Sequence, residues 1–317
     1  MSQQKIIAVI GATGQQGGGL AHAILDHGEF KLRAITRNPD SAKAQALRSA
    51  GAEVVVADNN DVESLVRAFE GAYGAFVVTN YWELFSPEKE KQQARNLAEA
   101  VQRAGVQHVI WSTLEDTRLD VPLTDDRMPT LMGEYKVPHF DAKGESDKEF
   151  TSRGVPVTFL RASFYWDNFI HFGSGPKRAE DGGLNLVLPM GDKELAGTAA
   201  EDIGGVAYGI FKRGKSMIGK VVGVAGEHLT GEEIAAKMSK ALGEKVRYVD
   251  VAPDVYRGLG FPGADDLGNM FQYYQEFEQK LAEVRSVEQS RELHPELQSF
   301  DEWLALHAHE IPIEQSV

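Results

Sequence analysis

The chain has 317 residues, of which 42% are hydrophobic and 25% charged, and its formal net charge is −14 at pH 7. This length is enough for one large domain, or for one domain with a smaller one beside it. The acidic balance and the lack of clustered basic residues argue against direct binding of nucleic acid. Without cysteine there are no disulfides, thiolate metal sites or thiol catalysis. No apolar run reaches the length of a membrane span, so we expect no membrane segment and a cytoplasmic protein.

Strands and helices alternate through the first half of the sequence. Short apolar segments predict six buried strands, at residues 5–10, 31–36, 53–57, 75–79, 107–112 and 156–160. Helical patterns lie between them, up to residue 27, at 41–50, from 61, at 87–104 and at 139–153. Strands that alternate with helices indicate βαβ units, so the predicted fold class is α/β with a doubly wound parallel Rossmann sheet.

The pattern changes after residue 161, where glycine and proline become frequent. A helix near 202–211, a strand at 221–225 and a helix at 230–242 are predicted, and the end of the chain is helical. Thr230 and Glu233 have the spacing of a capping box at the start of one of these helices. We predict an NADP-binding Rossmann domain of residues 1–161 that also receives 202–228. Residues 162–201 and 229–317 are expected to form a smaller, mostly C-terminal α+β domain for a substrate or partner.

A glycine-rich turn follows the first strand, with the sequence Gly11-Ala12-Thr13-Gly14-Gln15-Gln16-Gly17. Gly11 permits a tight turn, Gly14 lets the backbone approach a pyrophosphate, and Gly17 lets the helix pack closely on the strand. The next helix then offers unpaired N–H groups to phosphates. The turn therefore predicts a dinucleotide site, although a structural turn of another α/β fold is the alternative.

The second strand ends at Arg37, where a chain that binds NAD would place Asp or Glu. A guanidinium can pair with a 2′-phosphate through two hydrogen bonds and can stack on adenine. Arg37 therefore favours NADP(H) over NAD(H). The alternative is that Arg37 is a solvated surface cation.

Polar residues also follow the third and fourth strands. Asp58 and Asn59 could bind the adenine amino group, and Thr79 and Asn80 are expected below the nicotinamide half. Ordinary loop polarity explains the same residues equally well.

Several segments resemble a known family. They are residues 11–18 (GATGQQGG), 36–39 (TRNP), 78–83 (VTNYWE), 139–144 (HFDAKG) and 258–271 (GLGFPGADDLGNMF). Together they resemble the NmrA-like family of atypical short-chain dehydrogenases, and within it the HSCARG branch. The resemblance covers nearly the whole chain, and its last two motifs are more specific than the glycine turn.

The resemblance implies a Rossmann domain and a smaller domain with NADP in the cleft between them. Its cofactor contacts fall on the turn residues Gly11, Thr13, Gly14, Gln15, Gln16 and Gly17, on Arg37, on Thr79, Asn80 and Tyr81, on Lys143, and on Tyr165 and Asn168. The resemblance also implies sensing of the NADPH/NADP ratio and regulation of partner proteins. Other members, and relatives such as isoflavone reductases, are enzymes.

The catalytic pair of short-chain dehydrogenases is incomplete in this sequence. These enzymes use a tyrosine as proton donor and a lysine four residues later that holds the ribose and lowers the pKa of the tyrosine. Lys143 is present, but His139 stands in the place of the tyrosine. His139 could act as the acid, since histidine titrates near neutrality, or it could pack at the base of the helix without chemistry.

Other groups could replace the missing tyrosine. Tyr81 and Tyr165 could supply a phenol from elsewhere in the chain. Ser112 and Thr113 end the fifth strand, in the place of the usual serine of these enzymes, or they cap the turn from strand to loop. Lys143 could also transfer a proton alone, as in isoflavone reductases. An aromatic cluster at residues 271–277 is either core or the lining of a substrate cleft.

Two functions stay open at this point. The first is an NADP(H)-binding, redox-sensing regulatory protein without the usual catalytic tyrosine. The second is an NADPH-dependent reductase of a small ketone, quinone or imine. The partner is then a regulatory protein or a small molecule in the interdomain cleft, and a homodimer is left open. No metal site is predicted, because His307 and His309 are too few ligands.

Overall fold

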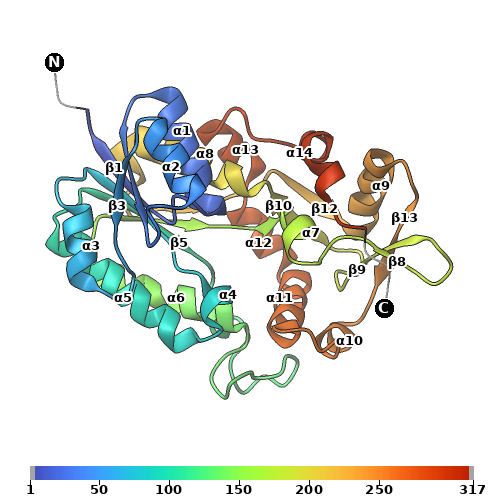
Figure 1. The fold of residues 1–317 in the computed structure, drawn as a ribbon. Coiled ribbons are helices and arrows are strands. Elements are labelled where there is room, and N and C mark those ends of the chain that lie inside the picture. The colour runs from blue at the N-terminus through green and yellow to red at the C-terminus, as the bar shows by residue number, and fades with distance from the viewer. Residues whose placement is uncertain (1–3, 314–317) are drawn as a thin grey trace.

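The computed structural model describes residues 4–313, which form one large parallel sheet and two small sheets (Figure 1). The large sheet has the strand order β11-β6-β5-β4-β1-β2-β3, and every neighbouring pair is parallel. Its strands are β1 (Ile6–Ile10), β2 (Lys31–Thr36), β3 (Glu53–Val56), β4 (Gly74–Val77), β5 (His108–Thr113), β6 (Val157–Arg161) and β11 (Val221–Gly223). This is the order of a Rossmann sheet with one added strand, so the predicted fold class is confirmed.

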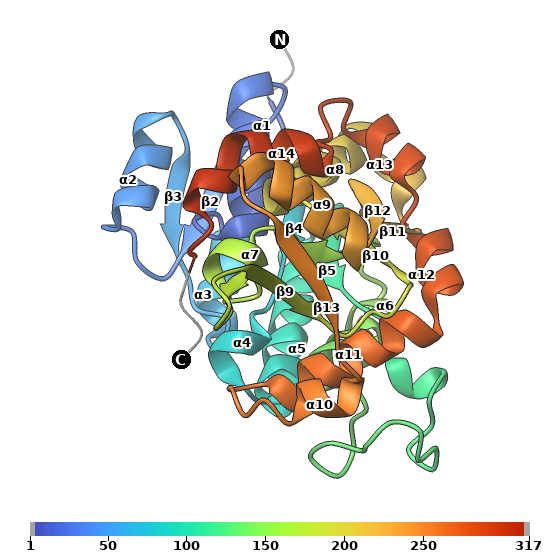
Figure 2. The same cartoon turned by 90° about the vertical axis from the view of Figure 1, so that its right-hand side faces the viewer.

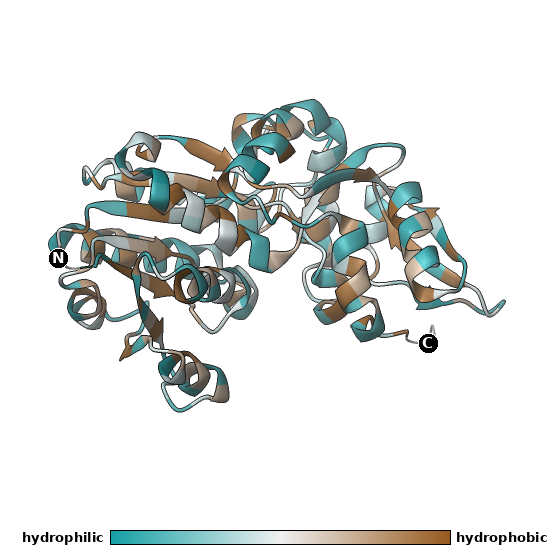
Figure 3. Ribbon diagram, turned by 90° about the horizontal axis from the view of Figure 1, so that it is seen from above, coloured by the Kyte–Doolittle hydropathy of each residue, from teal (hydrophilic) through white to brown (hydrophobic). Residues whose placement is uncertain are grey.

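Helices cover both faces of the large sheet (Figure 1). One face carries α1 (Gln15–His27), α2 (Ala42–Ser49) and α8 (Ala200–Arg213), and the other carries α3 (Val62–Phe69), α5 (Pro87–Arg103) and α6 (Pro138–Thr151). Central strands such as β1 read as continuous apolar runs because both of their faces are buried. Viewed from above, the strands of the large sheet are mostly hydrophobic, whereas the helices carry both hydrophilic and hydrophobic residues (Figure 3).

Residues 202–228 supply the edge strand β11 of the large sheet and most of α8, which covers one face of that sheet. β11 pairs with β6 at the sheet edge, and α8 packs on α1. The two helices touch through their backbones, because a Cβ on Gly204 would lie 2.0 Å from the backbone nitrogen of Leu20. A Cβ on Gly19 would lie 2.2 Å from the carbonyl oxygen of Glu201. The packing therefore requires glycine on both helices, while the division into domains stays a prediction.

The two small sheets lie beside the large one and share a separate core (Figure 2). Their strand orders are β12-β10-β7 and β13-β9-β8. The strands are β7 (Phe164–Tyr165), β8 (Lys177–Arg178), β9 (Leu184–Leu188), β10 (Glu194–Thr198), β12 (Glu227–Thr230) and β13 (Val246–Asp250). The helices are α7 (Asn168–His171), α9 (Gly231–Leu242), α10 (Pro253–Arg257), α11 (Ala264–Glu276), α12 (Glu278–Val284), α13 (Val287–Leu293) and α14 (Phe300–His307).

The start of one helix agrees with the sequence prediction, and the end of one strand differs from it. The predicted capping box is present at α9, where Thr230 accepts from the Glu233 backbone and the Glu233 carboxylate accepts from the Thr230 backbone. The fourth strand ends at Val77, two residues earlier than predicted, and a four-residue helix, α4 (Tyr81–Leu84), follows it. A single helical turn has no repeating apolar pattern from which it could be predicted.

Between residues 4 and 313, no helix combines the length and apolarity needed to cross a membrane.

Candidate functional site

The predicted cofactor residues gather at the carboxyl ends of the central strands. In the sheet, β1 lies between β2 and β4, so the chain leaves β1 toward one side and returns from β3 to the other. The loops after β1 and β4 therefore diverge, and doubly wound sheets bind their ligands in a crevice at this point, outside the carboxyl ends of the strands.

The glycine turn after β1 has the conformation that its three glycines allow. Gly11 has a φ of +67°, in the left-handed region that favours glycine. A Cβ on Gly17 would lie 2.4 Å from the carbonyl oxygen of Gly11, so α1 begins directly against β1. Gly14 is the N-cap of α1 and no side chain among the described residues caps this end. The first amides of α1 are thus free to bind an anion, and the turn fits the diphosphate of a dinucleotide.

Gln16 joins three segments at the base of the crevice. Its side-chain amide nitrogen donates a hydrogen bond to the Tyr165 hydroxyl, in β7. The Ser112 hydroxyl, at the end of β5, donates to the Gln16 amide oxygen at 2.7 Å. Burial raises the pKa of the Tyr165 phenol above its ordinary value. The predicted residues Gln16 and Tyr165 therefore meet, and Ser112 is bound to Gln16.

Lys143 lies in a buried polar network rather than in open space. Its ammonium donates to the carbonyl oxygen of Thr79 at 3.0 Å and to the Thr79 hydroxyl at 2.8 Å. It also forms an ion pair with Glu90, at 3.0 Å between Nζ and Oε1. Two of the three donors of the ammonium are thus hydrogen-bonded to Thr79, and its charge is paired with Glu90. Two predicted residues, Lys143 and Thr79, thus meet at the carboxylate of Glu90, which is not among the predicted site residues.

That group, Glu90, is completely buried in α5. The Thr79 hydroxyl donates to its Oε1 at 2.7 Å, while its Oε2 has no hydrogen-bond partner within residues 4–313. The sequence contains a signal for it, because Glu90 continues the buried helical face of Ala94, Leu97 and Val101. A carboxylate on an apolar helix face is unusual and indicates a buried charged partner.

His139 is held by a carboxylate from a distant part of the chain. Its Nδ1 lies 2.6 Å from Oδ1 of Asp266, and its backbone N–H donates to Oδ2 of the same carboxylate at 3.2 Å. Nδ1 donates in this contact, because an ionised carboxylate only accepts. The ring also lies 4.9 Å from the ring of Trp82, centroid to centroid, and is almost fully buried. His139 therefore packs and hydrogen-bonds at the base of α6, one of the two arrangements considered from the sequence.

Tyr81 lies in the same aromatic group, with its ring 5.8 Å from that of His139. Its side chain is buried. Burial, followed by the negative charge of Asp266, raises the pKa of the Tyr81 phenol. Neither Tyr81 nor Tyr165 is thus made more acidic by its surroundings.

Arg37 forms a bidentate ion pair with Glu83 of α4. Nη1 donates to Oε1 at 2.6 Å and Nη2 to Oε2 at 3.1 Å. The side chains of Arg37 and Glu83 are 66% and 45% exposed, so water screens this pair. The hydrogen bond to Glu83 raises the pKa of Arg37, and the charge of Asp58 acts in the same direction. Glu83 ends one of the quoted motifs, but it was not among the predicted site residues.

The remaining predicted residues stand at the rim of the crevice. Asp58 accepts a hydrogen bond from the backbone of Asn60 at 2.8 Å, and the carbonyl oxygen of Asn59 accepts from the Asn96 amide at 2.8 Å. Asn80 is the exposed N-cap of α4, and Asn168 begins α7. Contacts of these four residues with a cofactor stay predictions.

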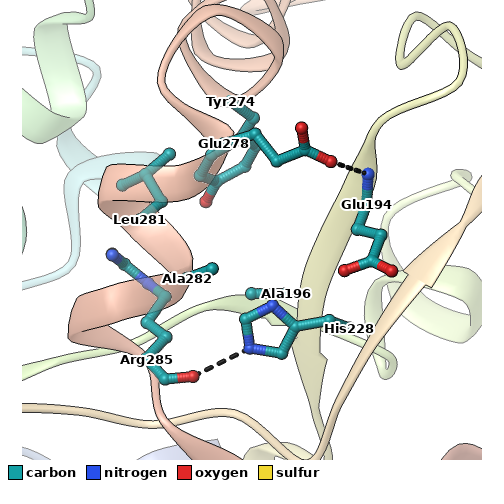
Figure 4. Close-up of a pocket in the computed structure, with 8 residues that line it drawn as sticks. All are labelled: Glu194, Ala196, His228, Tyr274, Glu278, Leu281, Ala282 and Arg285. Atoms are coloured by element: carbon teal, nitrogen blue, oxygen red, sulfur yellow. Dashed lines mark hydrogen bonds between the residues drawn. The ribbon is translucent and has the colours of Figure 1, made fainter.

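The aromatic cluster of residues 271–277 belongs to the core of the smaller sheets. One member, Tyr274, lines a cavity between α12 and the strands β10 and β12 (Figure 4). The cavity has a volume of about 10 Å³, room for roughly one water molecule. Two of its polar side chains are bound to the backbone, because Glu278 accepts from the Glu194 backbone and His228 donates to the Arg285 carbonyl oxygen. This cavity is therefore too small to hold a substrate.

A buried ion pair connects the end of the large sheet to the smaller sheets. Arg285, fully buried after α12, donates to both oxygens of Glu115 at 2.7 and 2.9 Å and to the carbonyl oxygen of Ala162. Burial alone would raise the pKa of Glu115, but the Arg285 charge holds it below its ordinary value. Glu115 and Ala162 follow β5 and β6, so this pair fixes α12 to the carboxyl edge of the large sheet.

Comparisons with known proteins give one consistent family. The model of the NmrA-like family matches residues 3–304. The NmrA-like family domain-containing oxidoreductase FrzB of a Cladobotryum species is 31% identical over 291 residues, which cover 85% of this chain and 84% of that protein. The similarly named lnbB of Aspergillus flavus is 30% identical over 289 residues, with coverage of 86% and 84%.

Solved structures with the same fold include NmrA, a negative transcriptional regulator. NmrA aligns with a TM-score of 0.79 at 26% identity, over 96% of this chain and 95% of that chain. Its complex with NADP aligns with a TM-score of 0.77, also at 26% identity and with the same coverage. NmrA has been solved with NAD as well.

Proposed function

The chain belongs to the NmrA-like family, and on this premise we propose that it is an NADP(H)-binding regulatory protein. In this proposal the chain responds to the redox state of the cofactor, passes that response to a partner protein, and has little or no turnover. NmrA, which is similar over nearly the whole chain, is a negative transcriptional regulator that has been solved with NADP. The same arrangement in this chain would make the crevice beyond β1 a sensing site.

Binding of NADP(H) is supported by the fit of the crevice to a phosphorylated dinucleotide. The uncapped amides of α1 face the place of the diphosphate, and the glycines leave room for it. The residue that β2 itself supplies at its tip is Arg37, a cation that can bind a 2′-phosphate. The bound nicotinamide would supply hydride chemistry, and the residues of this chain would position it.

The observation that carries the proposal is that the groups expected to catalyse are bound to other protein groups. Lys143 donates two hydrogen bonds to Thr79 and is ion-paired with Glu90, and His139 is bound to Asp266. An efficient general acid has a pKa near the working pH. Burial instead raises the pKa of both nearby phenols, those of Tyr81 and Tyr165.

A response to redox state follows from the charge of the cofactor. The oxidised nicotinamide ring carries a positive charge that the reduced ring lacks. The carboxylates of Glu90 and Asp266 lie beside the carboxyl end of β4, where that ring is expected. A charge difference of one unit near buried carboxylates is large enough to change affinity and local order.

Hydrogen exchange with saturating NADPH and with saturating NADP⁺ tests this proposal. We expect both forms to protect residues 81–86 and 119–134, which follow the strand ends beside the crevice, and to protect them to different extents. The second segment is a long irregular loop, the kind that often closes over a ligand. Identical exchange with the two forms, combined with equal affinities, would refute redox sensing. Absence of binding would refute the cofactor assignment itself.

A second candidate is an NADPH-dependent reductase of a small ketone, quinone or imine. The observation in its favour is that the curated relatives at 30% and 31% identity are named oxidoreductases. Lys143 is retained for this function, and its ammonium would have to leave Glu90 to reach a ribose or a substrate. Turnover measurements separate the two candidates.

A further inference from the structure

The ion pair between Arg37 and Glu83 crosses the mouth of the proposed cofactor crevice. Arg37 directly follows β2, and Glu83 lies in α4, which begins four residues after β4. In the sheet these two strands flank β1, whose carboxyl end carries the glycine turn. Neighbouring strands are about 4.8 Å apart, so the pair spans roughly 10 Å above the end of β1. A dinucleotide held by the turn would place its adenosine ribose next to this pair.

We propose that Glu83 is a cofactor-selecting residue that competes with the 2′-phosphate of NADP(H) for Arg37 and accepts a hydrogen bond from the 2′-hydroxyl of NAD(H). The proposal rests on the proposed function, since it concerns the same crevice. It predicts that the chain takes both cofactors, with a preference for NADP(H) that Glu83 keeps small.

The competition follows from the hydrogen bonds of the pair. Both terminal nitrogens of Arg37 are bound to the two oxygens of Glu83, which is the geometry that a phosphate would also use. A 2′-phosphate must therefore displace Glu83 or lie beside its negative charge. Asp58, whose charge also acts on Arg37, adds to this repulsion.

The same carboxylate suits a cofactor without the phosphate. Chains that bind NAD place Asp or Glu near the tip of β2, where the carboxylate accepts from the ribose 2′-hydroxyl. Arg37 holds Glu83 at that tip from the other side of the crevice, so Glu83 supplies an acceptor that β2 itself lacks. Both side chains are exposed, so they can exchange partners without disturbing the core.

The experiment compares 2′,5′-ADP with 5′-AMP, two probes that differ in the 2′-phosphate alone. Calorimetry on the wild type and on Glu83→Gln should show about three- to tenfold tighter binding of 2′,5′-ADP by the variant. Binding of 5′-AMP should stay equal or weaken. The matched control is Glu53→Gln, because Glu53 of β3 pairs with Arg33 of β2 at 2.8 Å, away from the carboxyl end of β2.

Each outcome of this comparison decides a different point. A selective gain for Glu83→Gln, absent from Glu53→Gln, supports the role of Glu83. An unchanged affinity of Glu83→Gln for 2′,5′-ADP, or an equal gain in both variants, overturns it and leaves the proposed function standing. If the wild type binds neither probe nor NADPH, the proposed function fails, and the role of Glu83 fails with it.

Discussion

The two ends of the proposed cofactor crevice are built in opposite ways. The exposed end consists of Arg37, Asp58 and Glu83, whose charged groups face water, and Arg37 pairs with Glu83 across the strand ends. The buried end consists of Thr79, Glu90, His139, Lys143 and Asp266, and nearly every polar group in it has a protein partner. Water screens charges at the exposed end, whereas at the buried end an unpaired charge has a high cost. The difference suggests that the exposed end selects the cofactor and that the buried end fixes its position.

The largest change in stability is expected when the ion pair between Lys143 and Glu90 is removed from the buried end. Lys143→Met leaves the Glu90 carboxylate buried without its cation, which should lower the free energy of unfolding by about 3 to 5 kcal/mol. NADPH binding should weaken as well. Urea unfolding measures the first effect, and the double variant with Glu90→Gln should recover most of the loss. A loss below about 1 kcal/mol in the single variant would mean that the pair is not buried as described.

The exposed end provides the matched comparison for that experiment. Arg37→Met breaks a bidentate pair too, yet its unfolding free energy should change by no more than about 0.5 kcal/mol, because water solvates both charges. A loss similar to that of Lys143→Met would remove the distinction between the two ends.

The response of stability to pH should come from a group outside the crevice. His108, fully buried in β5, has a pKa lowered by burial to about 4. Its Nε2 lies 2.9 Å from the Thr158 hydroxyl, which donates its own hydrogen to the Met217 carbonyl oxygen, so Nε2 of His108 must donate. With its pKa lowered to about 4, the ring is neutral at pH 7. As pH falls, the unfolded chain protonates His108 near pH 6.5, but the folded chain does so only near pH 4. The free energy of unfolding therefore decreases as the pH is lowered from about 6.5 to about 4.

The variant His108→Gln isolates this contribution. Between pH 7 and pH 4.5 the wild type should lose about 2 to 3 kcal/mol more than the variant. A direct comparison is needed because Asp147, whose pKa burial raises to about 6, acts in the opposite direction. Its folded form takes up a proton first, so it adds stability as pH falls. Parallel pH curves for the two proteins would contradict the account of His108.

A smaller effect is expected at the exposed end when Arg37 is removed. Arg37→Ala should weaken NADPH binding tenfold or more, since a charge-assisted contact contributes about 1.5 to 3 kcal/mol. NADH, without the 2′-phosphate, should lose much less affinity, because it loses only the positioning of Glu83 by Arg37. Calorimetry with both cofactors makes the comparison, and equal NADPH affinities in wild type and variant would remove Arg37 from the site.

The sequence predicts the large sheet well because its strands are apolar runs with helices between them. The strands β7 and β8 have two residues each, and α4 has four, so none of them repeats a pattern long enough to detect. Their positions depend on packing against the rest of the chain. The small sheets therefore become visible only in three dimensions.

In the candidate site, too, the sequence predicts some residues and the three-dimensional packing determines the others. Arg37, His139 and Lys143 stand in recognisable motifs, but the residues that bind them lie elsewhere in the chain. His139 and Asp266 are separated by 127 positions, and Arg37 and Glu83 by 46. Motifs identify which side chains carry chemistry, whereas tertiary contacts decide whether those side chains are free to act.

The most direct test of the account is turnover of NADPH by the wild type. Oxidation of NADPH is followed at about 340 nm with a panel of quinones, carbonyls and imines, at cofactor concentrations that calorimetry shows to be saturating. The account predicts no rate above the uncatalysed background, because Lys143 and His139 are bound to Glu90 and Asp266. A rate above about one per second on any substrate, within the ordinary range of enzymes, would contradict it and favour the reductase.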